Sequence, residues 1–518
     1  MLHGNKYEHP IGGLFEVGEN RRIAGQLKLK RSDLFDSNVV SIIDGDFFHL
    51  ADGGSLHGVS KFGKVSLLDC VRGGPLGMTK WDDFSIHHGN LSFRYALFGK
   101  RHVDIEDRCI RGIQFTLDGV KSNVFIHDRF DRFGRLDDPD DTVLSAIERT
   151  RPEHLRGEFV KGKAMVSYFT GHWDFLPRFE TVLGTVHVGR SILIEQFGPS
   201  MKDTPRIAVD FGDDPTTLEG AWEKMREIRQ FFAWMMGYAP AWKDVLVSTS
   251  RLDDNGTRSD ADGDLEVFAP NEWSEVPKAA RHYGTLIDAS RHPKHFKKVM
   301  TKWLERNGNA SRKRANARFF GCIAGTTKRV MEDGIVSAAN TFDLLPSEDK
   351  PQAQPLPDDV QAVLNDAKAQ VRRLIPSGTQ REEVLNDLGR ILRNKNAWLR
   401  KIVEHRAEIV LEGFGSDKLE QLEAVIPLAI GCRNHYTHGP ADRSSGDVDY
   451  ANFEVVRFLT ETLEFIYGAS ELLRCGWNPS KSATDAWHAL GGYANAYDTK
   501  RSRVLGLQSQ GSATVRHL

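Results

Sequence analysis

The strongest constraint on how this chain folds is a change in the spacing of its apolar residues. Up to about residue 210, apolar residues occur in short runs that end at Gly, Asp or Asn, a pattern typical of strands joined by turns. From about residue 285 onward, they recur at helical spacing. The sequence therefore predicts an α+β multidomain chain, with a β-rich N-terminal half followed by an all-α C-terminal half. The runs that indicate strands are QLKLK, NVVSIIDG, KVSLLDCV, LSFRYALFG, GIQFTLDG and RIAVDFG.

The β-rich half is expected to form a sandwich-like or strongly curved antiparallel sheet, because many short strands alternate with turn residues. One helix is expected within this half, at about 217–237. Thr217 can cap its first turn, and Gly237 can end it. The apolar stripe of this helix is typical of a buried face rather than a cofactor site. It consists of Leu218, Trp222, Met225, Phe232 and Met235.

Breaks in the helical pattern divide the rest of the chain. The polar segment SEDKPQAQPLPDD is expected to be a loop between helices. Asp417 and Glu420 form a D-x-x-E arrangement that indicates the start of a helix. The tail is rich in Gly, Ala, Ser and Asn and is expected to be poorly ordered.

The expected parts are a β-rich domain at 1–275, a basic helical connection at 276–346, a helical bundle at 347–485 and the tail at 486–518. Within the bundle, helices are expected at about 358–375, 380–411, 417–438 and 449–474.

Composition excludes several classes of protein. The net charge is −2, so any nucleic-acid site must be a local basic patch. The five cysteines show no CxxC spacing, and neither a signal peptide nor a membrane-spanning apolar run is present. We therefore expect a reduced cytoplasmic protein without membrane contact. The Asp-rich segment 127–141 and the His pair at 87–88 lack the spacing of metal sites. No metal and no cofactor are expected.

The stretch GCRNHYTHGP, residues 431–440, places groups that bind phosphate and transfer protons at the expected end of a helix. Arg433 offers a planar fork of donors that suits a phosphate. His438 carries an imidazole, a group that titrates near neutral pH. Such a pair can cleave RNA without metal: one group activates the ribose 2′-OH, and the arginine stabilises charge on the phosphate.

The spacing of this pair has a geometric consequence. Five residues correspond to about 140° around a straight helix, so Arg433 and His438 do not share one face. The turn before Gly439 and Pro440 can unwind enough to bring both toward one ligand. The R-x4-H pattern alone has little specificity, since Arg149/His154 and Arg400/His405 match it too. Only the third match has asparagine after the arginine and a Gly-Pro helix end.

In this context, CRNHYTHG resembles the R-N-x-x-x-H motif of HEPN ribonucleases. Three N-terminal segments resemble the β-rich N-terminal domain of ApeA-type abortive-infection proteins. The order of a β-rich domain before a HEPN bundle, in about 500 residues, is also similar to that family. The three segments are GGLFEVGENRRIAGQLKLK (12–30), LHGVSKFGKVSLLDC (56–70) and FRYALFGKRHVDIEDRCIRGIQFTLDGV (93–120).

The resemblance implies roles for the residues of the motif. It assigns phosphate binding to Arg433 and acid or base catalysis to His438, with Asn434 orienting the arginine or the RNA. His435 and Tyr436 fall at variable positions and are accessory candidates. The resemblance also implies that two HEPN bundles pair as a homodimer or higher homo-oligomer, that the substrate is RNA such as tRNA, and that an unidentified phage cue triggers the toxin.

Two other functions fit the same motif. A HEPN-like bundle without a working motif would be a dimerisation module that binds RNA or a protein without cutting. Alternatively, Tyr436 would be the acceptor of a covalent modification made by a partner enzyme. Loss of cleavage in Arg433→Ala would favour the enzyme, and the mass of the native protein would reveal a modification.

Residues 291–318 form the clearest basic segment, with ten Lys or Arg and one acid, Glu305. Such a segment can follow an RNA backbone. It also fits a solvated helix whose buried side carries Phe296, Met300 and Trp303. The candidates for RNA contact are Lys294, Lys297, Lys298, Lys302, Arg312, Lys313 and Arg314.

Overall fold

The computed structural model of the chain describes most residues of both halves. They are 11–16, 22–27, 29, 38–42, 53–81, 84–126, 133–151, 153, 165–169, 174–194, 201–250, 263–269, 284–324, 331–351, 358–394, 399–415, 419, 421–439, 449–481 and 490–514.

The N-terminal half contains the strands and three helices. The strands are β1 (Ile11–Glu16), β2 (Arg22–Leu27), β3 (Asn38–Ile42), β4 (Gly54–Ser60), β5 (Gly63–Trp81), β6 (Phe84–Gly99), β7 (Gly112–Leu117), β8 (Phe133–Asp137), β9 (Met165–Phe169), β10 (Asp174–Thr181), β11 (Gly184–Ile194), β12 (Met201–Asp210), β13 (Trp242–Ser248) and β14 (Asp264–Phe268). The helices are α1 (Val120–Val124), α2 (Asp141–Thr150) and α3 (Leu218–Met236).

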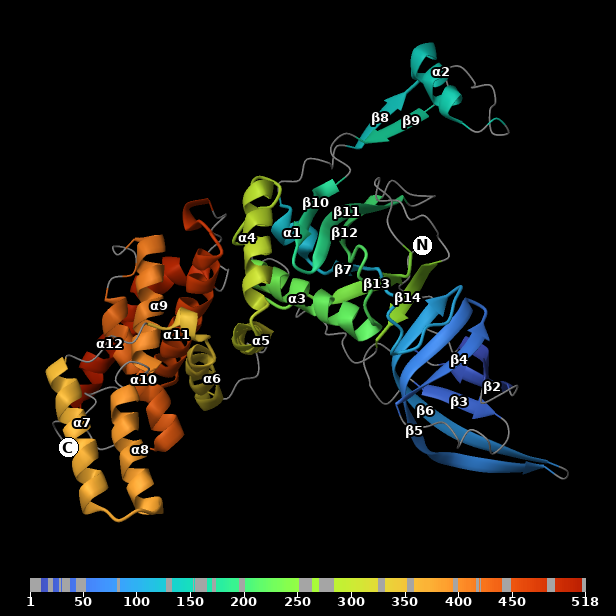
Figure 1. Cartoon of the computed structure of the whole chain (residues 1–518). Coiled ribbons are helices and arrows are strands. Elements are labelled where there is room, and N and C mark those ends of the chain that lie inside the picture. The colour runs from blue at the N-terminus through green and yellow to red at the C-terminus, as the bar shows by residue number, and fades with distance from the viewer. Residues whose placement is uncertain are drawn as a thin grey trace.

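The C-terminal half is helical. Its elements are α4 (Pro293–Asn307), α5 (Ala310–Ala324), α6 (Met331–Asp343), η7 (Ser347–Asp349), α7 (Asp358–Leu374), α8 (Thr379–Asn394), α9 (Leu399–Phe414), α10 (Leu422–His438), α11 (Phe453–Arg474), η9 (Pro479–Lys481) and α12 (Gly491–Thr514). The predicted fold class, a β-rich half followed by a helical half, is confirmed (Figure 1).

Twelve of the described strands form one antiparallel sheet with the order β10-β11-β12-β7-β13-β14-β6-β3-β2-β1-β4-β5. β5 also pairs with β6, so the last six strands of this order close into a ring. The ring encloses a separate apolar core that includes Phe15, Leu67 and Phe98. The remaining strands continue the sheet as an open extension, against which α3 packs. A second, smaller sheet pairs β8 with β9.

All six sequence runs predicted to be strands overlap strands of this sheet, although only Gln26 and Leu27 of QLKLK lie on β2. The strand order was not predictable, because strands that are distant in sequence lie next to each other. β13 and β14 follow α3 in the chain, yet they insert between β7 and β6 and join the two parts of the sheet. The polar, turn-rich segment 250–265 lies mostly outside the described residues, and its last residues belong to β14.

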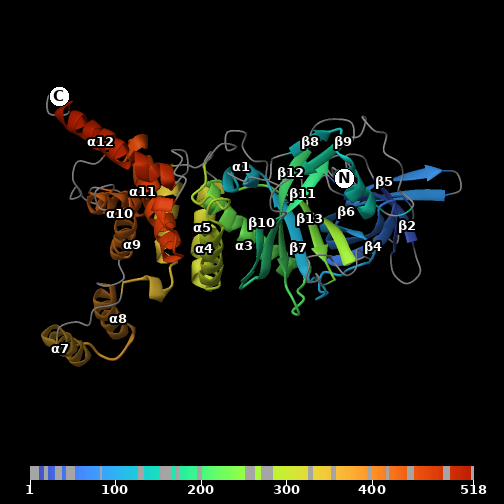
Figure 2. The same cartoon turned by 90° about the horizontal axis from the view of Figure 1, so that it is seen from above.

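The helix expected at 217–237 is confirmed as α3. The Thr217 side chain accepts a hydrogen bond from the backbone N–H of Gly220, and Gly237 ends the helix in the left-handed conformation at φ 74°. The predicted apolar stripe is fully buried. Its burial places α3 between the sheet and the helices that follow (Figure 2).

A single apolar core joins the two halves. Trp234 of α3 lies 5.7 Å from Trp303 of α4 and 6.1 Å from Tyr467 of α11, measured between ring centroids. Phe319 of α5 fills the space between Trp234 and Tyr467. A Cβ at Gly468 would lie 2.7 Å from the Phe319 ring, so glycine lets α5 approach α11. The boundary expected at 346 thus follows directly after Leu345, a member of this core, while the boundary expected at 275 lies outside the described residues.

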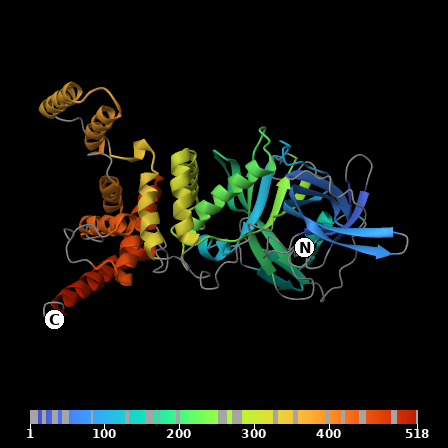
Figure 3. The same cartoon turned by 90° about the horizontal axis from the view of Figure 1, so that it is seen from below.

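The packed helical bundle consists of α6, α9, α10 and α11, and we call it the central bundle. It begins at Met331, within the segment 276–346 that was expected to be only a connection. The segment expected to be one helix at 380–411 contains α8 and α9, and residues 395–398 between them lie outside the described residues. α8 pairs with α7, and the two stand apart from the central bundle (Figures 2 and 3).

Two further expectations about the helices are wrong. The expected tail at 486–518 contains α12, whose first half packs against α11 and buries Tyr493 and Tyr497. α11 begins at Phe453, after the cap residue Asn452, rather than at 449. The expected cap residues Asp417 and Glu420 lie outside the described residues, and α10 begins at Leu422. None of the described helices has the length and apolar character that a membrane crossing requires.

A buried ionic network lies where α4, α5, α9 and α11 meet. Two carboxylates and four guanidinium groups take part in it. Arg406 and Glu471 are fully buried, with Arg406 Nη2 donating to Glu471 Oε2 at 2.8 Å. Because buried charges are stable only when they are paired, this network fixes the relative placement of these helices. Its members are Arg306, Arg312, Arg406 and Arg474 with Asp349 and Glu471.

Two histidines share one serine hydroxyl in the N-terminal half. His57 Nδ1 lies 3.1 Å and His102 Nδ1 lies 3.4 Å from Ser66 Oγ, and the two rings lie 4.8 Å apart. His57 Nε2 also contacts Asp104 Oδ1 at 3.0 Å. Burial lowers the pKa of His102, and the nearby His57 and Lys64 lower it further. The neutral form of His102 is therefore favoured by folding.

This histidine pair predicts an acid-sensitive N-terminal half. Because the pKa of His102 is lowered below its ordinary value of 6.5, its contribution to stability is present above about pH 6.5 and is lost as pH falls. We expect wild-type protein to lose more stability than His102→Gln when urea unfolding is compared at pH 7.5 and pH 5.5. His292→Gln is a control, since His292 makes no side-chain capping bond at α4. Equal losses in all three proteins would contradict this role.

Candidate active site

α10 ends at the position that the sequence predicted. The helix ends at His438, and Gly439 terminates it with φ 82°. Val425, Ile426, Ala429 and Cys432 are buried against the central bundle. This packing buries one side of α10. The polar residues of its last turns therefore lie on the other sides of the helix.

Tyr450 fastens the last turns of α10. Its hydroxyl donates to the Leu428 carbonyl at 3.3 Å, and its carbonyl accepts from the Tyr436 hydroxyl at 2.6 Å. A Cβ at Gly431 would lie 2.6 Å from the Tyr450 hydroxyl, so a larger residue at this position would force the hydroxyl to move. Partial burial raises the pKa of Tyr436. Tyr436 is therefore a structural anchor of the motif, and its hydroxyl is already engaged.

Arg433 is half-buried and is held by two amides. Its Nη1 donates to Asn434 Oδ1 and its Nη2 donates to Asn340 Oδ1, both at 3.1 Å. Its Nε is buried and has no hydrogen-bond partner among the described residues. The Arg433 carbonyl accepts from Thr437 Oγ1 at 2.8 Å, which is the usual back-bond of a threonine within a helix.

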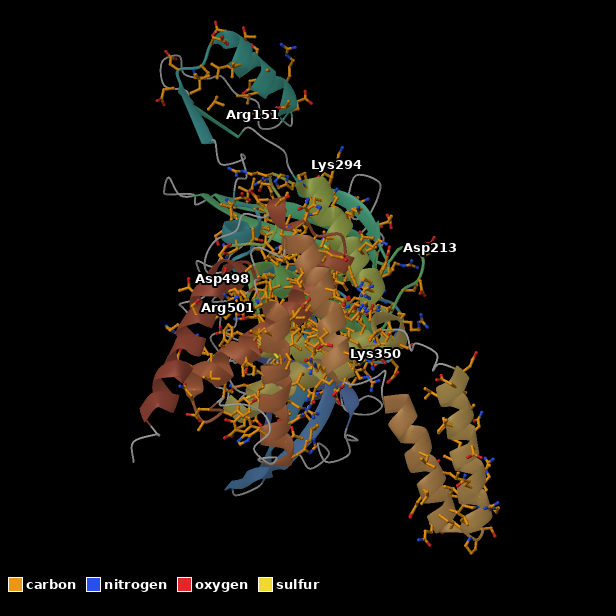
Figure 4. The ribbon with its side chains drawn as sticks, turned by 90° about the vertical axis from the view of Figure 1, so that its left-hand side faces the viewer. Arg151, Asp213, Lys294, Lys350, Asp498 and Arg501 are labelled. Atoms are coloured by element: carbon orange, nitrogen blue, oxygen red, sulfur yellow. The ribbon has the colours of Figure 1, made fainter. Side chains whose placement is uncertain are left out.

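Asn340 lies near the end of α6, where Asp343 and Lys350 also gather. Lys350, labelled in Figure 4, donates to the Asp343 carbonyl at 3.0 Å. Partial burial raises the pKa of Asp343, although Arg433 and Lys350 act in the opposite direction. The end of α6 and the end of α10 thus form one polar site.

Arg433 and His438 do not meet within one chain. α10 remains helical through His438, so the expected unwinding of its last turn is not present. About 140° of helix rotation separates the two side chains. Asn434 and His438 are exposed, whereas His435 is half-buried and its ring lies 5.5 Å from that of Tyr450. Of the five motif residues, only Arg433 and Asn434 contact each other through a described hydrogen bond.

The basic residues of segment 291–318 form two groups: some are exposed to solvent, and others are paired within the protein. Lys294, Lys298 and Lys302 are exposed at intervals of four residues along α4, and Arg314 is exposed on α5. Lys294 lies at the start of α4 (Figure 4). The opposite face of α4 buries Phe296, Met300 and Trp303, as expected for an amphipathic helix.

Three other basic candidates have partners inside the protein. Arg312 is buried, and its Nη2 donates to Asp349 Oδ2 at 2.6 Å. Lys313 Nζ donates to Glu227 at 2.8 Å, and Lys297 Nζ donates to the Pro177 carbonyl at 2.6 Å. Burial lowers the pKa of Lys297. Arg312 belongs to the ionic network, and its burial removes it from the candidates for RNA contact.

The Asp-rich segment has a structural role where it is described. Asp140 accepts from the backbone N–H of Val143 and caps α2, while residues 127–132 lie outside the described residues. Over the described ranges, no three His, Cys, Asp or Glu side chains are grouped to hold a metal ion.

The N-terminal half of the chain matches a known protein family. The family described as ApeA N-terminal domain 1 matches residues 11–303, which is more than half of the chain. The chain belongs to this family. The match covers the sheet, α3 and most of α4, and it indicates an ApeA-type protein of antiphage abortive infection. No curated protein and no solved structure gives a significant match.

The ApeA match ends within α4, before the helices that carry the polar site. Sequence reasoning missed Asn340, Asp343 and Tyr450 as parts of this site. Asn340 precedes Arg433 by 93 residues. An amide near the end of an otherwise ordinary helix carries no signal of such a contact, because only the packing of α6 against α10 brings them together.

Proposed function

We propose that this ApeA family member is a metal-independent HEPN endoribonuclease that acts in antiphage abortive infection. The observation that carries the proposal is the half-buried Arg433, which two neutral amides hold in place at a helix end within an R-N-x-x-x-H motif. A guanidinium in this state keeps its positive charge for a phosphate.

The proposed reaction is attack of a ribose 2′-OH on the adjacent phosphorus. His438 removes the 2′-OH proton or protonates the leaving 5′ oxygen, and Arg433 stabilises the charge that develops on the phosphoryl oxygens. The P–O5′ bond breaks as the O2′–P bond forms. The products are a 2′,3′-cyclic phosphate and a 5′-OH end.

A homodimer fits this reaction better than a single chain does. Since Arg433 and His438 point to different sides of α10, the arginine of one copy and the histidine of another can serve one phosphate. We propose that two copies of α10 face each other and complete the site. The RNA substrate, for which tRNA is the candidate, would follow the exposed lysines of α4, Lys294, Lys298 and Lys302, toward it.

RNA cleavage by the purified full-length protein in the presence of EDTA tests the proposal. We expect cleavage of total or phage-infected RNA that leaves 2′,3′-cyclic phosphate ends. Arg433→Ala is expected to reduce the rate at least about 100-fold, because it removes the charge that stabilises the transition state. The readout is the rate of product formation together with the chemistry of the ends.

Arg400→Ala is the matched control, because Arg400 belongs to an R-x4-H pair on α9 and bonds only locally to Glu404 at 2.6 Å. It should cleave at the wild-type rate. Cleavage that persists in Arg433→Ala, or that requires a divalent metal, would refute the proposal. Binding of RNA by wild-type protein without cleavage, on infected as well as uninfected RNA, would instead favour a non-catalytic HEPN module.

A further inference from the structure

The orientation of Arg433 depends on a residue outside its motif. Asn340 of α6 accepts from Nη2, while Asn434 of α10 accepts from Nη1. A guanidinium is a rigid plane with five N–H donors, so two fixed hydrogen bonds define the direction of the whole group. Asn434 is exposed and belongs to the same turn as Arg433, whereas Asn340 is half-buried on a different helix. Asn340 is therefore the firmer of the two supports.

The two bonds leave part of the guanidinium for a ligand. Three of the five N–H groups remain: one on each Nη and the one on Nε. The Nε is buried, so a ligand from solvent reaches the Nη hydrogens. A phosphate that approaches them can accept charge-assisted hydrogen bonds, as in other arginine–phosphate contacts.

The partners of Arg433 differ in charge from those of the arginines in the ionic network. Each of those four lies within 4 Å of Asp349 or Glu471. Across the described residues, Arg433 has no carboxylate within 4 Å and has amide partners instead. A carboxylate would orient the guanidinium equally well but would neutralise the charge that an RNA phosphate requires.

We propose that Asn340 is a positioning residue for the reaction: it aims Arg433 at the scissile phosphate through a neutral acceptor and so leaves the arginine charge to the RNA. The inference rests on the proposed function, in which Arg433 binds phosphate. The inference gives α6, which lies outside the R-N-x-x-x-H motif, a role in the active site.

Two substitutions at Asn340 separate orientation from charge. Asn340→Ala removes the acceptor and is expected to lower kcat/KM for RNA cleavage about 10- to 100-fold, as the loss of one hydrogen bond to a charged group does. Asn340→Asp keeps the shape and the acceptor oxygen but adds a negative charge. It is expected to lower kcat/KM at least as much as Asn340→Ala while keeping or raising the Tm, because it forms a new ion pair with Arg433.

Ser337→Ala is the matched control on α6. Ser337 lies one turn before Asn340 and accepts from Arg318 Nε at 3.3 Å, so its loss removes a comparable hydrogen bond to a different arginine. It should retain wild-type cleavage. Binding is measured separately with full-length His438→Ala protein and a fluorescent RNA oligonucleotide. In that background, both Asn340 substitutions should weaken RNA binding, and Ser337→Ala should not.

The outcomes distinguish this inference from the function on which it rests. Wild-type cleavage that Arg433→Ala abolishes, together with full activity in Asn340→Ala and Asn340→Asp, would overturn the role of Asn340 and leave the nuclease intact. Full activity in Asn340→Asp alone would overturn the requirement for a neutral acceptor. Cleavage that Arg433→Ala does not reduce would overturn both the nuclease assignment and the inference.

Discussion

Replacing Glu471 by alanine is expected to lower the apparent free energy of unfolding by about 3–5 kcal/mol, because it removes one partner from a buried set of ion pairs. Glu471 is fully buried and accepts from Arg306 Nε at 2.7 Å and from Arg406 Nη2 at 2.8 Å. Without Glu471, the nearest described carboxylate oxygen to buried Arg406 is Asp349 Oδ1, at 3.9 Å from Nη1. Urea unfolding followed by tryptophan fluorescence measures the loss.

The matched control for this prediction is Glu461→Ala on the same helix. Glu461 pairs with Arg457 and Lys500 at the surface, so its loss is expected to cost less than about 1 kcal/mol. Glu471→Gln, which keeps the volume but removes the charge, should fall between the two. Similar losses for Glu461→Ala and Glu471→Ala would show that the buried network is not what holds the helices together.

The effect of Glu471 should depend on pH in a defined direction. Burial raises the pKa of Glu471, but Arg406 and Arg306 lower it by more, so that it lies below the ordinary value of 4.5. The stability that Glu471 contributes is therefore present above about pH 4.5 and is lost as pH falls through its lowered pKa. The difference between wild type and Glu471→Ala should shrink in acid.

Replacing His438 by alanine is expected to reduce RNA cleavage about 10²- to 10⁴-fold at neutral pH, which is the usual loss when a general acid or base is removed. His438 is exposed at the last position of α10. Stability should therefore stay within about 0.5 kcal/mol of wild type, as for most surface substitutions. Cleavage rates and urea unfolding of the same preparations measure the two quantities.

Free imidazole gives this prediction a second readout. If the lost side chain transfers a proton, added imidazole should restore part of the activity of His438→Ala and should not restore that of Arg433→Ala. His405→Ala is the matched control, since His405 follows Arg400 at the same spacing but lies on α9, 3.3 Å from Arg474. A His438→Ala protein that cleaves RNA at the wild-type rate would remove His438 from the mechanism.

The local features of this protein followed from short-range patterns in the sequence. The alternation of apolar runs and turn residues predicted the strands, and the spacing of Leu218, Trp222 and Met225 predicted the buried face of α3. Gly439 predicted the end of α10, because a residue with positive φ terminates a helix. These features depend on residues that are only a few positions apart.

The same reasoning did not separate surface charges from buried ones. Arg312 belongs to the most basic segment of the chain and was a candidate for RNA contact, yet it is buried against Asp349. Lys313, the next residue, pairs with Glu227 of α3. Whether a basic residue faces solvent or an acid depends on which helix packs beside it, and a local charge count contains no information about that neighbour.

The order of a β-rich half before a helical half, and the end of α10 at Gly439, followed from the sequence alone. Only the tertiary structure decided that β13 and β14 join the sheet between β7 and β6, and that Asn340 reaches Arg433 across 93 residues. The physical reason is the range of the interactions. Backbone conformation and amphipathic faces are set by neighbouring residues, whereas strand pairing, buried ion pairs and the orientation of a guanidinium are set by side chains that meet only after the chain has packed.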